Sequence, residues 1–331
     1  MDQKKKLEVC VTGGTGFIAS HLIRALLHKG YNVRTTVRNP EDVSKTGFLW
    51  KMPNAKEQLR IVQADLMEEG SFDAAVSGVS CVFHTASPVA INPDMNPEVT
   101  FVRTHVQGNI NVLTACTKSP SIKRIILTSS CSAIRYDYNH TIEDPPLDES
   151  IWSNIEYCKE YKMWYAMAKT LGEKEAHAFA KERGLDLVVI NPSFVLGPML
   201  TPTPTSTISL VLQFITTGAG EYPNMRIGWV HIDDVVTAHL LAFEVPSANG
   251  RYICSGEVAH FGDVLQMLYN KYPKLKTSES SCSKEKGNNI FHTLDTSKIQ
   301  SLGLRGFKSL EQMIDDTIQS FHQHGLLEYL L

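Results

Sequence analysis

Two side chains that could move a proton lie one helical turn apart in the sequence. Tyr165 and Lys169 are four residues apart, so on a helix they share one face. A free tyrosine has a pKa of about 10, but a neighbouring ammonium and an oxidised nicotinamide both favour the phenolate. The pair could therefore protonate the alkoxide that forms when hydride reaches a carbonyl carbon. Lys169 would at the same time hydrogen-bond the ribose of the dinucleotide.

A serine at the end of an apolar strand completes the candidate set. Ser130 lies 35 residues before Tyr165 and follows the apolar run at 125–128. Its hydroxyl could donate to a substrate oxygen and hold that oxygen near Tyr165. We expect Ser130, Tyr165 and Lys169 to be catalytic, although a tyrosine and a lysine at this spacing also occur on ordinary surface helices.

A glycine-rich turn lies between a strand-like run at 7–12 and a helix-like run at 17–29. Glycine at position 13 permits a tight turn, and Gly16 lets the backbone approach a pyrophosphate at a helix N-terminus. The third small position is Ala19, which still admits close packing of helix on strand. This order predicts a dinucleotide site whose contacts come from Gly13, Thr15, Gly16, Phe17 and Ile18.

The end of the next strand indicates which dinucleotide is bound. A site for NAD places a carboxylate roughly 20 residues beyond the glycines, on the ribose 2′-hydroxyl. Here the segment 34–40 has no carboxylate, and the first one is Glu41. Arg38 could instead make a charge-assisted contact with a 2′-phosphate, and Lys45 could add to it. We predict NADP(H) as cofactor; the alternative is that Arg38 is a solvated surface residue.

Two further strand ends should border the same cofactor, since ligands bind at the carboxyl ends of parallel strands. Asp65 and Leu66 follow the third strand and are expected near the adenine. Residues 85–87 follow the fourth strand and are expected near the nicotinamide-side ribose. An aspartate at such a position can also be only a helix cap. The predicted contacts are Asp65, Leu66, Thr85, Ala86 and Ser87.

Strands rich in Val, Ile and Leu alternate with helix-length segments through the first half of the chain. The strand-like runs are 7–12, 32–37, 59–64, 81–84, 125–128 and 187–190. This alternation predicts an α/β fold with a Rossmann-type, doubly wound parallel sheet covered on both faces. After residue 191, prolines and weaker strand signals indicate a smaller C-terminal α+β substrate lobe. We therefore expect an NADP-binding domain at 1–191 and a substrate lobe at 192–331, with about 226–243 packing back on the first domain.

Composition excludes several other classes of protein. The 331 residues are 43% hydrophobic and 20% charged, with a net charge of −3, so nucleic acid is not an expected partner. No window approaches the about 18 unbroken apolar residues of a membrane helix. The seven cysteines show no metal-ligand spacing, so no metal is expected. Scattered thiols and the lack of an apolar leader indicate a cytoplasmic protein. A monomer and a dimer both remain open.

Taken together, these motifs resemble the extended short-chain dehydrogenase/reductase family, in its plant dihydroflavonol-reductase-like branch. The segments VTGGTGFIAS, TVRNP, ADLMEEGSFD, VFHTASPV, LTSSCSA, WYAMAK, NPSFVLGP, VHIDDV and DTSKIQSLG match the family pattern in order along nearly the whole chain. The resemblance implies a Rossmann fold and reduction of a carbonyl group with NADPH. It also implies that Pro192, Ser193 and Val195 lie beside the nicotinamide, with Ser206 near the cofactor.

Within this branch, LTSSCSAIRY, YCKEYKMWYAMAKTLGE and GEYPN are most similar to a group of reductases that act on tetraketide α-pyrones during sporopollenin formation. The resemblance then implies a polyketide substrate, made from a fatty acyl-CoA, whose carbonyl is reduced to an alcohol. Arg135 and Tyr222 are candidates for the wall of the substrate pocket. Either side chain could equally belong to the surface or the core.

Two departures distinguish the chain from other members of the branch. Dihydroflavonol reductases commonly place an asparagine where this sequence has Arg135, and cinnamoyl-CoA reductases carry KNWYCYGK where this sequence has KMWYAMAK. Reduction of a dihydroflavonol, a cinnamoyl-CoA or an aromatic aldehyde remains the alternative. Two other classes are a sugar-nucleotide epimerase or dehydratase and a non-catalytic NADP-sensing protein. The first typically has acidic groups after the serine-rich strand, and the second normally loses the tyrosine or the lysine.

Overall fold

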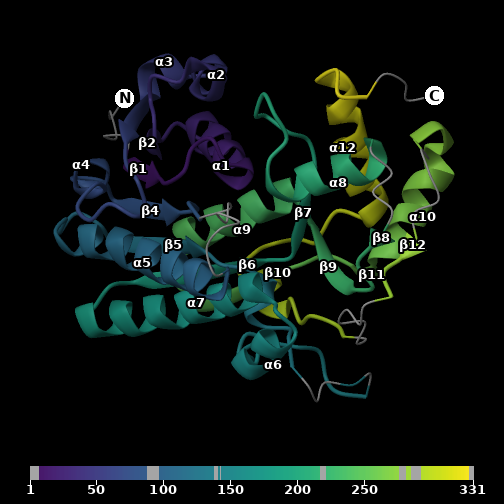
Figure 1. Ribbon diagram of the computed structural model, residues 1–331. Helices are drawn as coiled ribbons and strands as arrows, with labels where there is room; N and C mark the ends of the chain where they lie inside the picture. The colour runs from purple at the N-terminus through teal and green to yellow at the C-terminus, as the bar shows by residue number, and fades with distance from the viewer. Residues whose placement is uncertain are drawn as a thin grey trace.

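Short runs of aliphatic residues form seven parallel strands at the centre of the protein. The computed structural model describes residues 7–87, 97–137, 141, 143–216, 221–275, 281–284 and 292–327 (Figure 1). The sheet has the order β10-β6-β5-β4-β1-β2-β3, and every neighbouring pair is parallel. Its strands are β1 (Glu8–Val11), β2 (Asn32–Val37), β3 (Leu59–Gln63), β4 (Cys81–His84), β5 (Arg124–Thr128), β6 (Leu187–Pro192) and β10 (Gly250–Cys254).

Alternate residues of these strands enter two different hydrophobic cores, because side chains of a strand point to opposite faces. Val9 and Val11 of β1 belong to one core, whereas Cys10 belongs to the other. In β6 the same division separates Val188 from Val189. A sheet that is apolar on both faces requires helices on both faces.

Helices cover the two faces of the sheet separately (Figure 1). One face packs against α1 (Phe17–His28) and α9 (Ile232–Glu244), and the other against α4 (Asp73–Val76), α5 (Pro97–Thr117) and α7 (Trp164–Arg183). Shorter elements connect them: α2 (Val43–Thr46), η1 (Leu49–Lys51), α3 (Ala55–Gln58), η2 (Cys131–Ala133) and α6 (Ile155–Glu160). The predicted α/β fold with a doubly wound parallel sheet is confirmed.

The remaining elements build a smaller lobe around a mixed sheet of three strands, in the order β11-β9-β7. The lobe contains β7 (Phe194–Leu196), α8 (Ser206–Thr216), β8 (Glu221–Tyr222), β9 (Arg226–His231), β11 (Val258–His260), α10 (Phe261–Lys271), η3 (Pro273–Leu275), β12 (Ser281–Cys282), α11 (Ser297–Ser301) and α12 (Leu310–Gln323). Strand β9 pairs in parallel with β7 and antiparallel with β11, and β8 pairs with β12.

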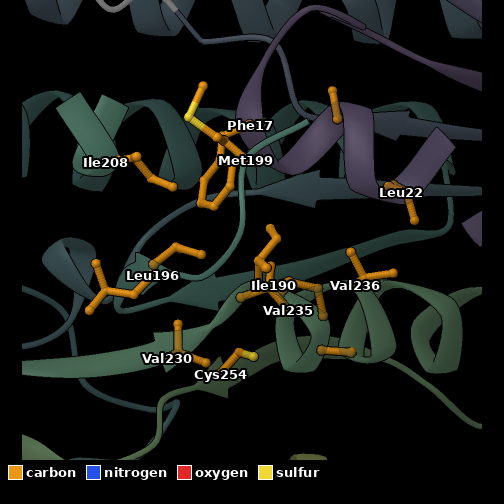
Figure 2. Close-up of a cluster of buried hydrophobic side chains, with 14 of the residues drawn as sticks. Phe17, Leu22, Ile190, Leu196, Met199, Ile208, Val230, Val235, Val236 and Cys254 are labelled. Atoms are coloured by element: carbon orange, nitrogen blue, oxygen red, sulfur yellow. The ribbon is translucent and has the colours of Figure 1, made fainter. Parts of the chain in front are cut away.

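The two lobes share one core. Figure 2 shows Phe17 of α1, Ile190 of β6 and Val235 of α9 in a cluster that continues to Leu196 and Val230 of the second sheet. Helix α9 packs against α1, β5 and β6. Strand β10 completes the large sheet although it lies far beyond residue 191. The chain thus returns to the first lobe with the consecutive elements α9 and β10, and the division at residue 191 stays a prediction.

Among the described residues, no helix is both long and apolar enough to cross a membrane. All seven cysteines are free thiols. The described residues contain no group of His, Cys, Asp and Glu side chains that could hold a metal ion.

Candidate active site

The candidate site lies at the carboxyl ends of β1, β4 and β5. Strand order reverses between β1 and β4, because β2 and β3 continue on one side and β5 and β6 on the other. In a doubly wound sheet this reversal leaves a crevice that binds ligands. The glycine-rich turn follows β1, residues 85–87 follow β4, and Ser130 follows β5. Three of the predicted motifs therefore meet at one edge of the sheet.

The glycine-rich turn brings its backbone against the neighbouring strands. Gly13 has a φ of 73°, in the left-handed region that favours glycine. Its amide donates to Thr36 Oγ1 at 3.1 Å, and the amide of Gly14 donates to the Thr36 carbonyl at 2.9 Å. Gly16 is the N-cap residue of α1 and has no side chain that could bond the first amides of the helix. The first amides of α1 have no partner within the helix and can meet a phosphate.

Gly14 has no room for a side chain. A Cβ at this position would lie 2.3 Å from Thr35 Oγ1, which itself donates to the Val11 carbonyl at 2.7 Å. We expect Gly14→Ala to lower the free energy of unfolding by about 1–3 kcal/mol, as overpacking does. Urea unfolding would measure this. Gly108→Ala on α5 is the control, since its new Cβ would lie 3.4 Å from Leu66, and equal stability of all three proteins would contradict the packing described here.

A chain of hydrogen bonds anchors this turn to β4 and α5. The hydroxyl of Thr12 accepts the amides of Thr85 and Ala86 at 3.1 and 3.0 Å. It also lies 2.9 Å from Nδ1 of His84, and Nε2 of His84 lies 3.1 Å from Oδ1 of Asn109. Burial lowers the pKa of His84 to about 4, so the ring is neutral. Thr12 therefore donates to Nδ1, and Nε2 donates to the amide oxygen.

Lys169 is buried, with only 8% of its surface exposed. Its Nζ donates to Ser87 Oγ at 3.1 Å, and that oxygen lies 3.0 Å from Nε2 of His105. Nδ1 of His105 donates to the Phe101 carbonyl at 2.9 Å, so Nε2 is the acceptor for Ser87. Burial and the charge of Lys169 lower the pKa of His105 to about 3, which keeps this tautomer neutral. The Ser87 hydroxyl therefore donates its proton to His105, and its oxygen accepts the hydrogen bond from the Lys169 ammonium.

Burial also acts on the two candidate proton-transfer groups. It lowers the pKa of Lys169 to about 8, against the opposing charge of Glu173. Although 46% of Tyr165 is exposed, the protein around its phenol raises the pKa to about 12, and the nearby Ser130 hydroxyl opposes this rise. The Lys169 Nζ lies 5.8 Å from the centroid of the Tyr165 ring. Without a cofactor, Lys169 does not offset this rise, and the expectation that its ammonium and an oxidised nicotinamide together favour the phenolate stays a prediction.

Ser130 is oriented by the turn that follows β5. It caps η2, and its Oγ accepts the Ser132 amide at 3.0 Å. Because that bond uses a lone pair of the oxygen, the hydroxyl proton remains available for an acceptor in the crevice. Ser130, Tyr165 and Lys169 thus come from two elements, the end of β5 and the first turns of α7, and the phenol of Tyr165 lies near both of the other side chains.

The residues predicted near the adenine end differ in their surroundings. Arg38 follows β2, is exposed and makes no hydrogen bond or ion pair with the described residues. Lys45 lies 3.3 Å from Asp42, so part of its charge is already balanced. Asp65 Oδ1 accepts the Met67 amide at 2.8 Å within a turn, so it caps no helix, and its contact with the cofactor stays a prediction. Of the two basic residues, Arg38 is therefore the one that shares its charge with no carboxylate of the described residues, and it can bind a 2′-phosphate.

The residues expected on the nicotinamide side lie at the junction of the two lobes. Pro192 ends β6, and the amide of Ser193 donates to the Cys254 carbonyl of β10 at 3.1 Å. Val195 is buried in β7, and its carbonyl accepts the hydroxyl of Thr207 at 2.6 Å. Ser206, which opens α8, is exposed and has a φ of 55°. The start of α8 is therefore tied to β7.

The two candidates for the wall of the substrate pocket, Arg135 and Tyr222, both make contacts within the protein. Arg135 is buried, donates to the Arg226 carbonyl at 2.8 Å and lies over the ring of Tyr136 at 4.1 Å. Tyr222 is half-buried in β8 and meets the ring of His260 edge-on, at 6.3 Å between centroids. Their place at a substrate remains a prediction.

Comparison with known proteins agrees with this geometry. The model of the NAD dependent epimerase/dehydratase family matches residues 9–254, which includes the turn, Ser130, Tyr165 and Lys169. The chain belongs to this family. The resemblance to extended short-chain dehydrogenases/reductases is thereby confirmed.

Several members of the family are similar over their whole length. Tetraketide alpha-pyrone reductase 2 of Arabidopsis thaliana is 56% identical over 97% of this chain and 99% of its own. The crystal structure of vestitone reductase from alfalfa has a TM-score of 0.79 at 34% identity, covering 97% of this chain and 100% of its own. The yeast methylglyoxal/isovaleraldehyde reductase complexed with NADPH has a TM-score of 0.83 at 26% identity, again over 97% and 100%.

In this family member, sequence reasoning missed the polar partners that hold the predicted residues. Thr12 with His84 and Ser87 with His105 are pairs separated by 72 and 18 positions. Nothing in the local sequence signals such pairs. The hydrogen bonds of His84 to Thr12 and Asn109 give this histidine a structural role.

Proposed function

We propose that the chain is an NADPH-dependent reductase that converts a carbonyl of a tetraketide α-pyrone to an alcohol. The observation that carries the proposal is the meeting of Ser130, Tyr165 and Lys169 at the crevice beside the glycine-rich turn. The substrate is suggested by the relative at 56% identity. The exposed, unpaired Arg38 supports NADPH over NADH.

The residues at the crevice fit a bound dinucleotide. Gly13 is in the left-handed conformation and the start of α1 is uncapped, so together they form a cradle for a phosphate. Side chains in place of the glycines would fill this cradle. Arg38 would bind the 2′-phosphate, and Lys169 and Ser87 would face the nicotinamide-side ribose. The cofactor contacts that we propose are Gly13, Thr15, Gly16, Phe17, Ile18, Arg38, Lys45, Asp65, Leu66, Thr85, Ala86, Ser87, Pro192, Ser193, Val195 and Ser206.

Three side chains would carry the reaction on the carbonyl. NADPH, when bound, would supply a hydride to the carbonyl carbon, and the negative charge would develop on the carbonyl oxygen. Ser130 donates a hydrogen bond to that oxygen and stabilises its developing charge. Tyr165 transfers its hydroxyl proton to the same oxygen, which leaves a phenolate. The Lys169 ammonium stabilises the phenolate, and this interaction offsets the high pKa of the phenol.

The substrate choice is supported by the surroundings of Arg135. Dihydroflavonol reductases commonly have an asparagine at the position of Arg135. Here a buried guanidinium is held by the Arg226 carbonyl and Tyr136. Position 135 therefore offers no amide to a flavonoid ring. The free thiols of the chain fit a reducing compartment, and we propose that the enzyme is cytoplasmic.

A substrate panel tests this proposal. Loss of NADPH absorbance would be followed with a synthetic tetraketide α-pyrone, a dihydroflavonol, a hydroxycinnamoyl-CoA and simple aldehydes. We expect the pyrone to give the highest kcat/KM. A higher value for any other substrate would contradict the substrate assignment, and no turnover with any of them would contradict the reductase assignment.

A further inference from the structure

Glu173 is a buried carboxylate on α7 that the proposed reaction does not use. Only 1% of its surface is exposed, yet it lies one turn after Lys169. A buried charge is costly unless it is paired and hydrogen-bonded. The contacts that stabilise Glu173 therefore indicate what the residue holds in place.

Both oxygens of the carboxylate accept hydrogen bonds. Oε2 accepts Ser129 Oγ at 2.5 Å and Asn191 Nδ2 at 2.8 Å, and Oε1 accepts Arg251 Nε at 2.6 Å. The three donors come from the end of β5, from β6 and from β10. One side chain thus connects α7 to three adjacent strands of the sheet.

These bonds act on the segment that carries Ser130. Ser129 is the preceding residue, and Asn191 Nδ2 also donates to the Ser130 carbonyl at 3.2 Å. The backbone of Ser130 is therefore held on both sides by groups that Glu173 orients. Since Tyr165 and Lys169 lie on the same helix as Glu173, this carboxylate connects the helix that carries them to the segment that carries Ser130.

Arg251 balances the charge of Glu173 and is itself fixed. Its Nη1 donates to the carbonyls of Glu149 and Ile151 at 2.8 and 2.7 Å, and its guanidinium lies 3.6 Å from the centroid of the Trp152 ring. Nε2 of His177 lies 3.9 Å from Glu173 Oε1. The carboxylate is consequently held in one position rather than sampling several.

We propose that Glu173 is a positioning residue for the reduction, which fixes Ser130 through Ser129 and Asn191 and places it opposite Tyr165 and Lys169. This inference rests on the proposed reductase function. It predicts an effect on the rate rather than on binding, because Glu173 is buried and both of its oxygens are bound by side chains of the protein.

Glu173 also acts on the charge of Lys169. The groups that influence the Lys169 region are Glu173 on α7, His84 on β4 and His105 on α5, and both imidazoles are neutral because their pKa values are lowered. The negative charge of Glu173 raises the pKa of Lys169 against burial. Removing that charge lowers the pKa further, so Lys169 loses its proton at a lower pH.

Glu173→Gln in the full-length protein tests the proposal. All three partners of Glu173 are donors, so the amide nitrogen of Gln would face a donor and break the arrangement. We expect kcat with the pyrone to fall by about 10- to 100-fold, as misplacement of a reacting group by up to 1 Å does. The KM for the carbonyl and the Kd for NADPH should stay unchanged, and the alkaline limb of kcat should move to lower pH.

Glu175→Gln is the matched control, because Glu175 is exposed on the same helix. Ser129→Ala is the second variant, since it removes one bond and leaves the Glu173 and Arg251 charges paired. We expect Ser129→Ala to lower kcat with the alkaline limb unmoved. If Glu173→Gln does not fold, the kcat of Ser129→Ala alone tests the positioning role of Glu173.

The outcomes separate two kinds of failure. A wild-type protein without reductase activity contradicts the proposed function. An active wild type whose Glu173→Gln and Ser129→Ala variants both match Glu175→Gln overturns the positioning role. An equal loss of kcat and NADPH affinity in Glu173→Gln also overturns it, because that result indicates general damage to the fold.

Discussion

Replacing Tyr165 with phenylalanine should lower kcat by about 100- to 10,000-fold, the range that a general acid contributes. Tyr165→Phe removes only the hydroxyl, so the alkoxide has no proton donor. The half-exposed ring remains at the edge of the crevice, and its packing against His105 is kept. We therefore expect NADPH affinity, measured by fluorescence titration, to stay nearly intact.

Tyr161→Phe provides the control for this experiment. Tyr161 is 41% exposed and packs against the ring of Tyr157 just before α7. Its variant should keep the wild-type rate. Wild-type turnover by Tyr165→Phe would show that another group supplies the proton.

Arg38→Asp should reverse the preference for NADPH over NADH. The variant removes a charge-assisted hydrogen bond to the 2′-phosphate, worth about 1.5–3 kcal/mol, and places a carboxylate where it would repel the phosphate. We expect the ratio of kcat/KM for NADPH to that for NADH to fall by about 100-fold or more. Initial rates with each cofactor at a fixed carbonyl concentration would measure it.

Arg60→Asp is the matched control for the cofactor experiment. Arg60 is also exposed, but it lies at the start of β3, away from the carboxyl end of the sheet. Its variant should leave the ratio unchanged. An unchanged ratio in Arg38→Asp would contradict the assignment of NADP(H) from this strand end.

The strands and first helix of the large sheet could be predicted from the sequence because local patterns specify them. The apolar runs at 32–37 and 81–84 coincide with β2 and β4, and the glycine-rich turn precedes α1. Strand β10 was not predicted as part of this sheet. Its pairing with β6 joins Gly250 to Val188, and no local pattern indicates which sheet a distant strand joins.

Only those residues of the candidate site that belong to a recognisable motif could be predicted from the sequence. The glycines, Arg38, Ser130, Tyr165 and Lys169 each stand out by type and position. Their supporting bonds could not be predicted, because Glu173 meets Arg251 across 78 positions and a buried ion pair depends on the fold. The high pKa of the Tyr165 phenol without a cofactor could not be predicted for a similar reason, since it depends on how the protein packs around that phenol.

Isotope transfer tests the central assignment most directly. The protein would be incubated with a tetraketide α-pyrone and NADPH carrying deuterium at the reactive position of its nicotinamide ring, and the product would be analysed by mass spectrometry. We predict an alcohol with a single deuterium on the former carbonyl carbon from wild type, and almost none from Tyr165→Phe. A product without deuterium, or one that has lost water or changed only its stereochemistry, would contradict the account.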